Sequence, residues 1–335
     1  MDSPTLAYVI RRLLWVPPTL FVVSFLTFAM TRLGPGDPIR IAAGQFRDDE
    51  AFARIRAARG LDKPLYEQYY IYMEGVLTRA DLGESYRYKD YNVSEIIFPA
   101  IWRSMQYNIV AIAITIGLGI PLGVYAATRQ GTWADPASIS VFLLFTSIPS
   151  LITVYVLLYV FALKLGILPA RGWPQDCPVR LDFLPSSYQC IGVISPEAII
   201  PILTFSIAGV AGWARFTRAF TLDVLKEDYV RTARSKGLPN RAVLTRHVLR
   251  NALLPLTTMI GFALIGIYEG SFFVETIAGI PGYGRLTVES ITGRDYDMIM
   301  AVTLIGASTF VIAMIFIDIA YTMIDPRIRY GSRNR

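Results

Sequence analysis

Long stretches without a charged residue are the feature that most constrains this chain. None occurs from Leu13 to Met30 or from Tyr107 to Ala127. A helix needs about 20 apolar residues to cross the hydrocarbon core of a bilayer. Only 17% of the chain is charged, against about 25% in an ordinary soluble domain. The sequence therefore predicts an all-α polytopic membrane protein.

About six transmembrane helices are expected, at Tyr8–Leu33, Tyr107–Ala127, Ile139–Leu163, Ala198–Phe220, Leu253–Phe273 and Met298–Ile319. The first apolar run is longer than the core of a secretory signal, and no small-residue cleavage site follows it, so we expect an uncleaved span. The predicted organisation is residues 1–33 for the start and first span, 34–106 for a polar extramembrane subdomain, 107–323 for the membrane core, and 324–335 for a tail.

Basic residues in the short segments that flank the spans predict how the chain is oriented in the membrane. Arg11 and Arg12, the segment 222–250 and the arginine-rich tail fall on one side of a six-span chain. The excess of Lys and Arg in short cytoplasmic flanks then places both termini in the cytoplasm and residues 34–106 outside it. Cys177 and Cys190 share the loop after the third span, which this map also places outside, where disulfides persist. A disulfide is therefore expected, and two unpaired thiols are the alternative.

Signatures of enzymes are absent from the sequence. There is no Gly-Lys dipeptide and so no phosphate-binding loop of the Walker type. His247 is the single histidine, which excludes a zinc motif with two histidines on one helix. The net charge of +6 comes from bases beside apolar spans, where membrane topology requires them. We therefore expect no catalytic residue, no metal, no cofactor bound by this chain and no nucleic-acid partner.

The loop 222–250 predicts two helices that meet at a glycine. Gly237 suits the left-handed position that ends a helix, and Pro239 prevents its continuation. Asn240 is expected to cap a second helix that runs into the fifth span. The expected apolar face consists of Leu222, Leu225, Tyr229 and Ala233. A basic helix pair of this kind either lies on anionic lipid or forms a rigid knob for a cytoplasmic partner.

Residues Asp228–Leu238, with the sequence DYVRTARSKGL, resemble the cytoplasmic "EAA" loop of ABC-importer permeases in the dipeptide, oligopeptide and nickel branch. Arg231, Thr232 and Ala233 occupy the E-A-A positions, and Gly237 is the motif glycine. Arg250 departs from the general pattern, which favours proline there. Other segments that resemble this branch, in order, are LGPGDP (33–38), GLDKPLYEQYY (60–70), ADLGES (80–85), TSIPSL (146–151), GILP (166–169), VETIAGIPGYGRL (274–286), DYDMIMAV (295–302) and DPRIRY (325–330).

The resemblance implies a permease subunit of an ATP-driven importer in a bacterial or archaeal cell membrane. Its implied partners are a second homologous permease, two cytoplasmic ATPase subunits that bind ATP and Mg, an extracytoplasmic substrate-binding protein, and the lipid bilayer. The implied substrates are di- and oligopeptides, with nickel, glutathione or a sugar as alternatives. The implied ATPase-coupling contact consists of Asp228, Tyr229, Arg231, Thr232, Ala233, Lys236 and Gly237.

Acidic residues in the apolar regions are candidates for a substrate path, because ionisable groups in a membrane are costly. Glu269 is expected in the outer half of the fifth span, where it faces a central cavity and holds a peptide's amino terminus. The alternative is a charge that extends to the interface. Glu275 lies near a span end. A secondary transporter and a membrane enzyme are the competing functions, but the sequence shows neither a clear internal repeat nor two carboxylates placed to meet deep in the bilayer.

Overall fold

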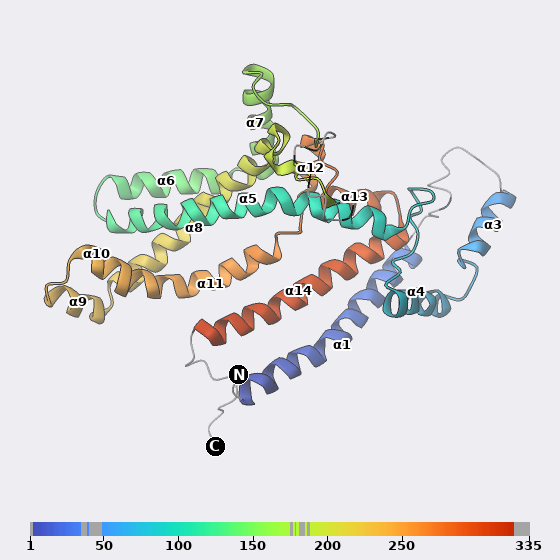
Figure 1. Ribbon diagram of the computed structural model, residues 1–335, viewed down its shortest axis with the longest axis horizontal. Coiled ribbons are helices and arrows are strands. Elements are labelled where there is room, and N and C mark those ends of the chain that lie inside the picture. The colour runs from blue at the N-terminus through green and yellow to red at the C-terminus, as the bar shows by residue number, and fades with distance from the viewer. Residues whose placement is uncertain are drawn as a thin grey trace. The chain divides into compact units, whose positions relative to one another are not determined.

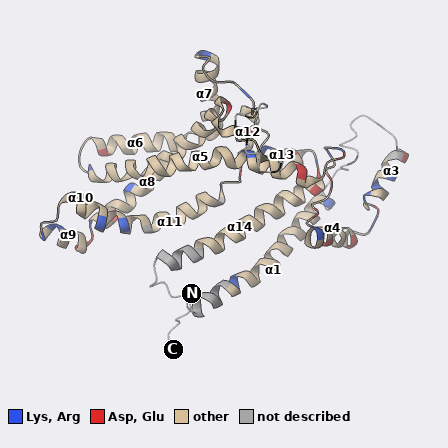
Figure 2. Cartoon of the chain, in the orientation of Figure 1, with Lys and Arg blue, Asp and Glu red and all other residues tan. Residues whose placement is uncertain are grey.

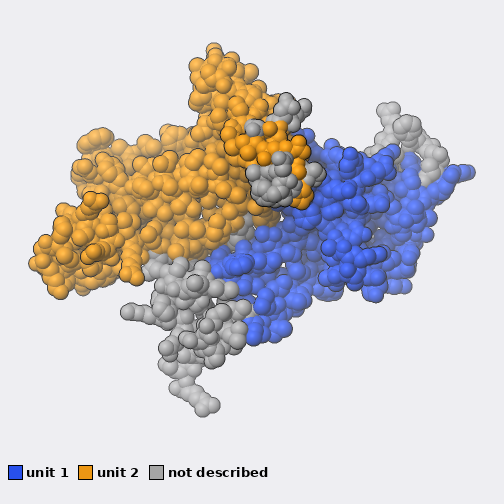
Figure 3. All heavy atoms as spheres, in the orientation of Figure 1, with its two compact units in different colours: residues 1–102, 282–335 blue, residues 103–281 orange. Residues whose placement is uncertain are grey.

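A computed structural model describes residues 3–34, 39, 49–174, 177, 179–180, 185 and 188–324. Regular structure in these ranges is helical, apart from two isolated β-bridges, Glu84–Asn92 and Arg180–Cys190. The chain forms two compact units, coloured separately in Figure 3. Residues 1–102 and 282–335 form unit 1, and residues 103–281 form unit 2.

Unit 1 contains two long apolar helices, α1 (Ser3–Leu33) and α14 (Tyr296–Ile324), which pack along each other (Figure 1). The shorter helices α3 (Asp49–Ala58), α4 (Leu65–Arg79) and α13 (Tyr283–Thr292) complete it. Tyr69 of α4 joins α1 through a hydroxyl contact of 2.8 Å with Ser24 and an edge-on contact with the Phe28 ring. The polar helix α4 is therefore anchored on the first span.

The start of α14 is fixed by a buried carboxylate. Asp295 is 1% exposed and accepts hydrogen bonds from the backbone N–H groups of Tyr86 (3.1 Å) and Arg87 (3.3 Å) and from the Ser85 hydroxyl. It also accepts from the N–H of Met298 at 3.4 Å, at the start of the helix. The motif segments 80–85 and 295–302, which lie far apart in the sequence, therefore meet at Asp295.

Unit 2 is built around α5 (Val93–Thr128), whose residues from Arg103 onward belong to it, with α6 (Ala134–Ser147) and α8 (Ile199–Leu225) alongside (Figure 1). Ala126, Phe142, Ala211 and Ala214 form a core shared by the three helices. A Cβ atom placed on Gly123 of α5 would lie 2.5 Å from the carbonyl oxygen of Ala214. Small residues thus let the backbones of α5 and α8 approach closely, as is common between membrane helices.

We expect Gly123→Ala to destabilise unit 2, because its methyl group would meet backbone that cannot rotate away. Overpacking of this kind costs about 1–3 kcal/mol. Gly117→Ala is the matched control on the same helix, since nothing lies within 4 Å of its Cβ position. The thermal midpoint of the purified protein in detergent should fall for Gly123→Ala and stay level or rise for Gly117→Ala. Equal midpoints for the two variants would contradict the close approach.

Two predicted spans are not single straight helices. The third, Ile139–Leu163, is bent by 93° between α6 and the helix formed by α7 (Ser150–Leu157) and η1 (Leu158–Lys164). Ile148 is extended (φ −81°, ψ 117°), because Pro149 disfavours the helical conformation of the residue before it. The fifth ends early, since α11 (Arg250–Ile265) stops at Gly266 and α12 (Phe272–Ala278) begins after a break.

The described ranges contain fewer long apolar helices than the predicted six spans. In the described ranges, four helices are long and apolar enough to cross a membrane, or five if the bent pair is one span. They are Ile10–Leu33, Val93–Thr128, Pro196–Leu225 and Tyr296–Ile317. The apolar part of α11, Pro255–Leu264, is shorter. The all-α polytopic fold class is confirmed, and α5 begins at Val93, upstream of the predicted start at Tyr107.

Candidate coupling site

The predicted helix pair follows α8 directly. A turn at Lys226 and Glu227 ends α8, and α9 spans Asp228–Ser235. The next helix is continuous through α10 (Asn240–Ala242), η5 (Val243–Leu249) and α11 (Figure 1). We call residues 228–249 the coupling segment. Helix α10 begins at Asn240 itself, with Pro239 at the cap position and no side-chain capping bond, so the predicted cap by Asn240 is wrong.

The predicted apolar face of the coupling segment is only partly right. Glu227 is extended (φ −65°, ψ 143°), so the helical phase does not continue from α8 into α9. The buried side of α9 consists of Val230, which is 0% exposed, and Ala233, while Tyr229 is 41% exposed. Tyr229 instead accepts a hydrogen bond at its hydroxyl from the Asn251 amide, at 2.9 Å.

Gly237 ends α9 in the left-handed conformation, with φ of +75°. Its N–H donates to the Arg234 carbonyl at 2.9 Å, and the N–H of Leu238 donates to the Ala233 carbonyl at 3.4 Å. This pair of bonds is the Schellman motif, which satisfies the last carbonyls of a helix. Nothing lies within 4 Å of a Cβ placed at Gly237. The backbone conformation alone, and not a lack of space, therefore favours glycine.

A small core attaches the coupling segment to two long helices. Val230 and Ala233 of α9 pack against Val243 and Val248 of η5. Val224 of α8 packs on the same core. Because η5 continues into α11, α9 is joined to both α8 and α11. The same core therefore holds α9 against α8 and against the helix that continues into α11.

The outer face of α9 is polar and open. The side chains of Asp228 and Arg231 are 94% and 73% exposed and form a pair at 3.3 Å, one helical turn apart. Thr232, Lys236 and Gly237 are also exposed. Lys and Arg residues gather around α9 and α10 in Figure 2. Of the predicted contact residues, only Ala233 lies beneath this surface, at 5% exposure, where its small side chain lets α9 approach η5.

The loop with the cysteines lies at the other end of α5. Cys177 and Cys190 form a disulfide, with their Cα atoms 5.2 Å apart. The Gln106 side chain donates to the Cys190 carbonyl at 2.9 Å and accepts from the Gly192 N–H at 2.7 Å. Ala127 lines a groove beside the coupling segment. At about 1.5 Å per residue, α5 rises about 32 Å between Gln106 and Ala127, close to the hydrocarbon thickness of about 30 Å.

Glu269 does not lie in a helical span. It falls in the break after α11, where it is exposed, so its predicted position in the fifth span is wrong. The physical reason is a side chain of α5: the Asn108 amide donates to the carbonyls of Ile267 (3.1 Å) and Glu269. These bonds replace those that a longer helix would supply. Glycines at 266 and 270 also weaken the helix.

Two acids are buried beside partners that the sequence does not reveal: Glu275, which the sequence places near a span end, and Asp135. Glu275 is 0% exposed and accepts hydrogen bonds from the hydroxyls of Tyr107 (2.5 Å) and Ser104 (2.7 Å). Asp135 at the start of α6 binds Arg218 near the end of α8, with distances of 2.5 and 2.8 Å from its Oδ1 to the guanidinium. The sequence signal for such a residue is an acid among apolar residues. This signal does not show which distant residue will contact the acid.

The fold and this site define a polytopic α-helical membrane protein with a rigid, exposed segment attached to its long helices. Residues 119–330 match the family described as "Binding-protein-dependent transport system inner membrane component", and residues 5–92 match its N-terminal counterpart. The chain belongs to this family of transport permeases. The predicted resemblance to ABC-importer permeases is confirmed.

Individual relatives match over nearly the whole chain. The oligopeptide transport system permease protein OppB is 35% identical in Haemophilus influenzae and 34% identical in Escherichia coli, over 97% of this chain and 100% of each relative. The glutathione transport system permease protein GsiC of Escherichia coli is 36% identical over 97% of this chain and 99% of its own length. A solved structure of the MetNI methionine ABC transporter is 16% identical, with a TM-score of 0.48 over 69% of this chain and 96% of that one.

Family membership fixes the general role. The chain is a multi-pass inner-membrane component of an ABC importer, and it is a transport subunit rather than an enzyme. A binding-protein-dependent system also contains a substrate-binding protein and an ATPase subunit.

Proposed function

We propose that this chain is a permease subunit that carries di- and oligopeptides across the membrane after an extracytoplasmic binding protein delivers them. The identity of 34–35% to oligopeptide permeases over 97% of the chain supports this substrate class. Glutathione is itself a small peptide, so the relative with 36% identity is compatible with the same chemistry. Glutathione, nickel and sugars are the alternative substrates within the same importer class.

The observation that carries the proposal is the attachment of α9 to both α8 and α11 through one core. In the proposed topology the coupling segment lies in the cytoplasm and the disulfide loop lies outside. The proposed complex holds a second homologous permease and two ATPase subunits, which bind ATP and Mg. The exposed residues Asp228, Tyr229, Arg231, Thr232, Lys236 and Gly237 touch an ATPase subunit.

Mechanical transmission then couples hydrolysis to transport. When the ATPase subunits close, they displace α9, and the shared core passes this movement to α8 and α11. A rigid-body tilt of these helices opens the path alternately to each side of the membrane. Ala233 shapes the joint between α9 and η5 and does not touch the ATPase.

Uptake by the reconstituted complex tests the proposal. The complex, purified with its partner subunits and placed in liposomes with the binding protein, should take up labelled dialanine in an ATP-dependent, vanadate-sensitive manner. An excess of unlabelled peptide should compete, whereas nickel ions or a sugar should not. Uptake that a proton gradient drives without ATP would instead indicate a secondary transporter.

A further inference from the structure

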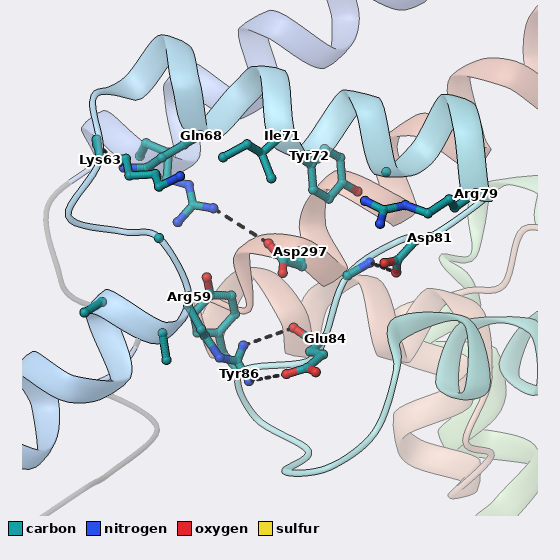
Figure 4. Close-up of a pocket in the computed structure, with 16 residues that line it drawn as sticks. Arg59, Lys63, Gln68, Ile71, Tyr72, Arg79, Asp81, Glu84, Tyr86 and Asp297 are labelled. Carbon is teal, nitrogen blue, oxygen red and sulfur yellow. Dashed lines mark hydrogen bonds and ion pairs between the residues drawn. The ribbon is translucent and has the colours of Figure 1, made fainter.

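Unit 1 contains a hollow of its own. Its walls come from the end of α3 and the connection to α4, from α4 itself, from residues 81–86, from the end of α1 and from the start of α14 (Figure 4). Its volume is about 550 Å³, within the range of about 300–1,000 Å³ that small-molecule sites occupy. The residues that matter here are Arg32, Gln68, Tyr72, Arg79 and Asp297.

Three residues that line this hollow carry buried polar atoms without hydrogen-bond partners. The Arg32 side chain is 10% exposed, and its Nη2 lies 3.7 Å from Asp297. Its Nε and Nη1 have no hydrogen-bond partner among the described residues. The Tyr72 hydroxyl and the Gln68 Oε1 are buried and unpartnered in the same way. Leaving a buried polar atom unpaired costs about 1–3 kcal/mol, and more for a charged group. The two Arg32 nitrogens and the Tyr72 hydroxyl therefore favour an occupant with a hydrogen-bond acceptor, and the Gln68 Oε1 favours one that also carries a donor.

The charges that line the hollow favour an occupant whose acidic group carries a single negative charge. Four bases line it, Arg32, Arg59, Lys63 and Arg79, against three acids, Asp81, Glu84 and Asp297. A doubly charged anion such as phosphate would be repelled by these acids.

Two of the bases are already held by carboxylates. Arg59 pairs with Glu84 at 3.4 Å, and Lys63 pairs with Glu67 at 2.8 Å. Arg79 has no ion pair among the described residues. Arg79 is therefore available to an added anion.

Tyr72 is suited to donate to such an anion. Burial, and then the nearby Asp297 and Asp81, raise the pKa of its hydroxyl well above the ordinary value. The group therefore keeps its proton under all physiological conditions. Figure 4 shows Tyr72 and Arg79 projecting from α4 toward the same hollow as Asp297. Ile71 and Ala57 add apolar wall.

We propose that this hollow binds a small organic carboxylate of about the size of a dipeptide, with its carboxylate facing Arg32 and Tyr72 and with Arg79 at the rim. All of its lining residues belong to unit 1, whereas the coupling segment belongs to unit 2, and its occupancy does not require ATP hydrolysis or the binding protein. The proposal therefore stands apart from the transport mechanism.

Equilibrium binding to the assembled transporter tests the site. The complex is purified without its binding protein, placed in lipid nanodiscs without nucleotide, and titrated calorimetrically with dialanine and with dialanine amide, which lacks the carboxylate. Dialanine should bind at least about tenfold more tightly than the amide, the equivalent of about 1.4 kcal/mol. Tyr72→Phe and Arg79→Gln should each weaken dialanine binding at least about tenfold, as expected for a hydrogen bond to a charged group.

Arg54→Gln is the matched control, because Arg54 is 78% exposed on α3 and pairs only with Glu50 in the described residues. It should leave the affinity for dialanine unchanged. Equal affinities for dialanine and its amide, no binding of either, or wild-type affinity in both pocket variants would contradict a carboxylate site in this hollow. Tyr72→Phe removes a single oxygen, and elution of each variant with its full set of subunits shows that it is assembled. Failure of this test leaves ATP-driven uptake unaffected, so the two proposals fail separately.

Discussion

Replacing Gly237 with valine is expected to reduce ATP-driven uptake at least about tenfold while the protein still inserts in the membrane. With φ of +75° at this position, a residue with a Cβ costs about 1–2 kcal/mol, a factor of about 5–30 in the population of the native turn. A β-branched residue costs more. Gly237→Pro should be at least as severe, because proline fixes φ near −65° and removes an N–H that donates to Arg234.

Gly237→Asn is the control, because asparagine adopts the left-handed conformation more readily than other residues with a side chain and the space around Gly237 is open. Uptake and ATP hydrolysis should be measured together in liposomes. The coupling account predicts that hydrolysis continues in the valine variant without matching transport, and that the asparagine variant retains most of its uptake. Wild-type uptake by Gly237→Val would contradict the assigned role of this turn.

Arg218→Leu is expected to destabilise the protein by about 3–5 kcal/mol, because it leaves the buried carboxylate of Asp135 without its partner. The two side chains are 17% and 12% exposed, so water compensates little for the loss. A buried pair replaced by apolar residues is often tolerated. The double variant Asp135→Leu with Arg218→Leu should therefore recover most of the lost stability.

The four members of this cycle can be compared by their unfolding midpoints in detergent. Strong coupling between the two substitutions is expected, with the double variant closer to wild type than Arg218→Leu alone. If the two effects simply add, the pair does not hold α6 to α8, and another contact must position the start of α6.

The sequence predicted where helices occur because hydropathy and charge act over many residues at once. It also located the turn at Gly237, since a glycine followed by a proline is a local signal for the end of a helix. The apolar face of α9 was misplaced because two residues, Lys226 and Glu227, interrupt the helix and change its phase.

Contacts between distant residues account for the other differences. The end of α11 depends on bonds from Asn108, which lies far upstream, so an apolar run alone suggested a longer helix. Glu269 and Glu275 look alike in the sequence. Only the hydroxyls of Tyr107 and Ser104 distinguish Glu275 as the buried acid. In the same way, the residues next to Asp295 and Asp135 in the sequence do not indicate which distant residues contact these two acids.

Thiol labelling in intact cells tests most directly whether the coupling segment lies in the cytoplasm, where the ATPase subunits would displace it. Thr232→Cys introduces an exposed thiol on α9, and Ile194→Cys introduces one beside the disulfide loop, where Ile194 is 65% exposed. The native cysteines are joined to each other and do not react. With a membrane-impermeant maleimide, the account predicts labelling of Ile194→Cys in intact cells and of Thr232→Cys only after permeabilisation. Labelling of Thr232→Cys in intact cells would contradict it.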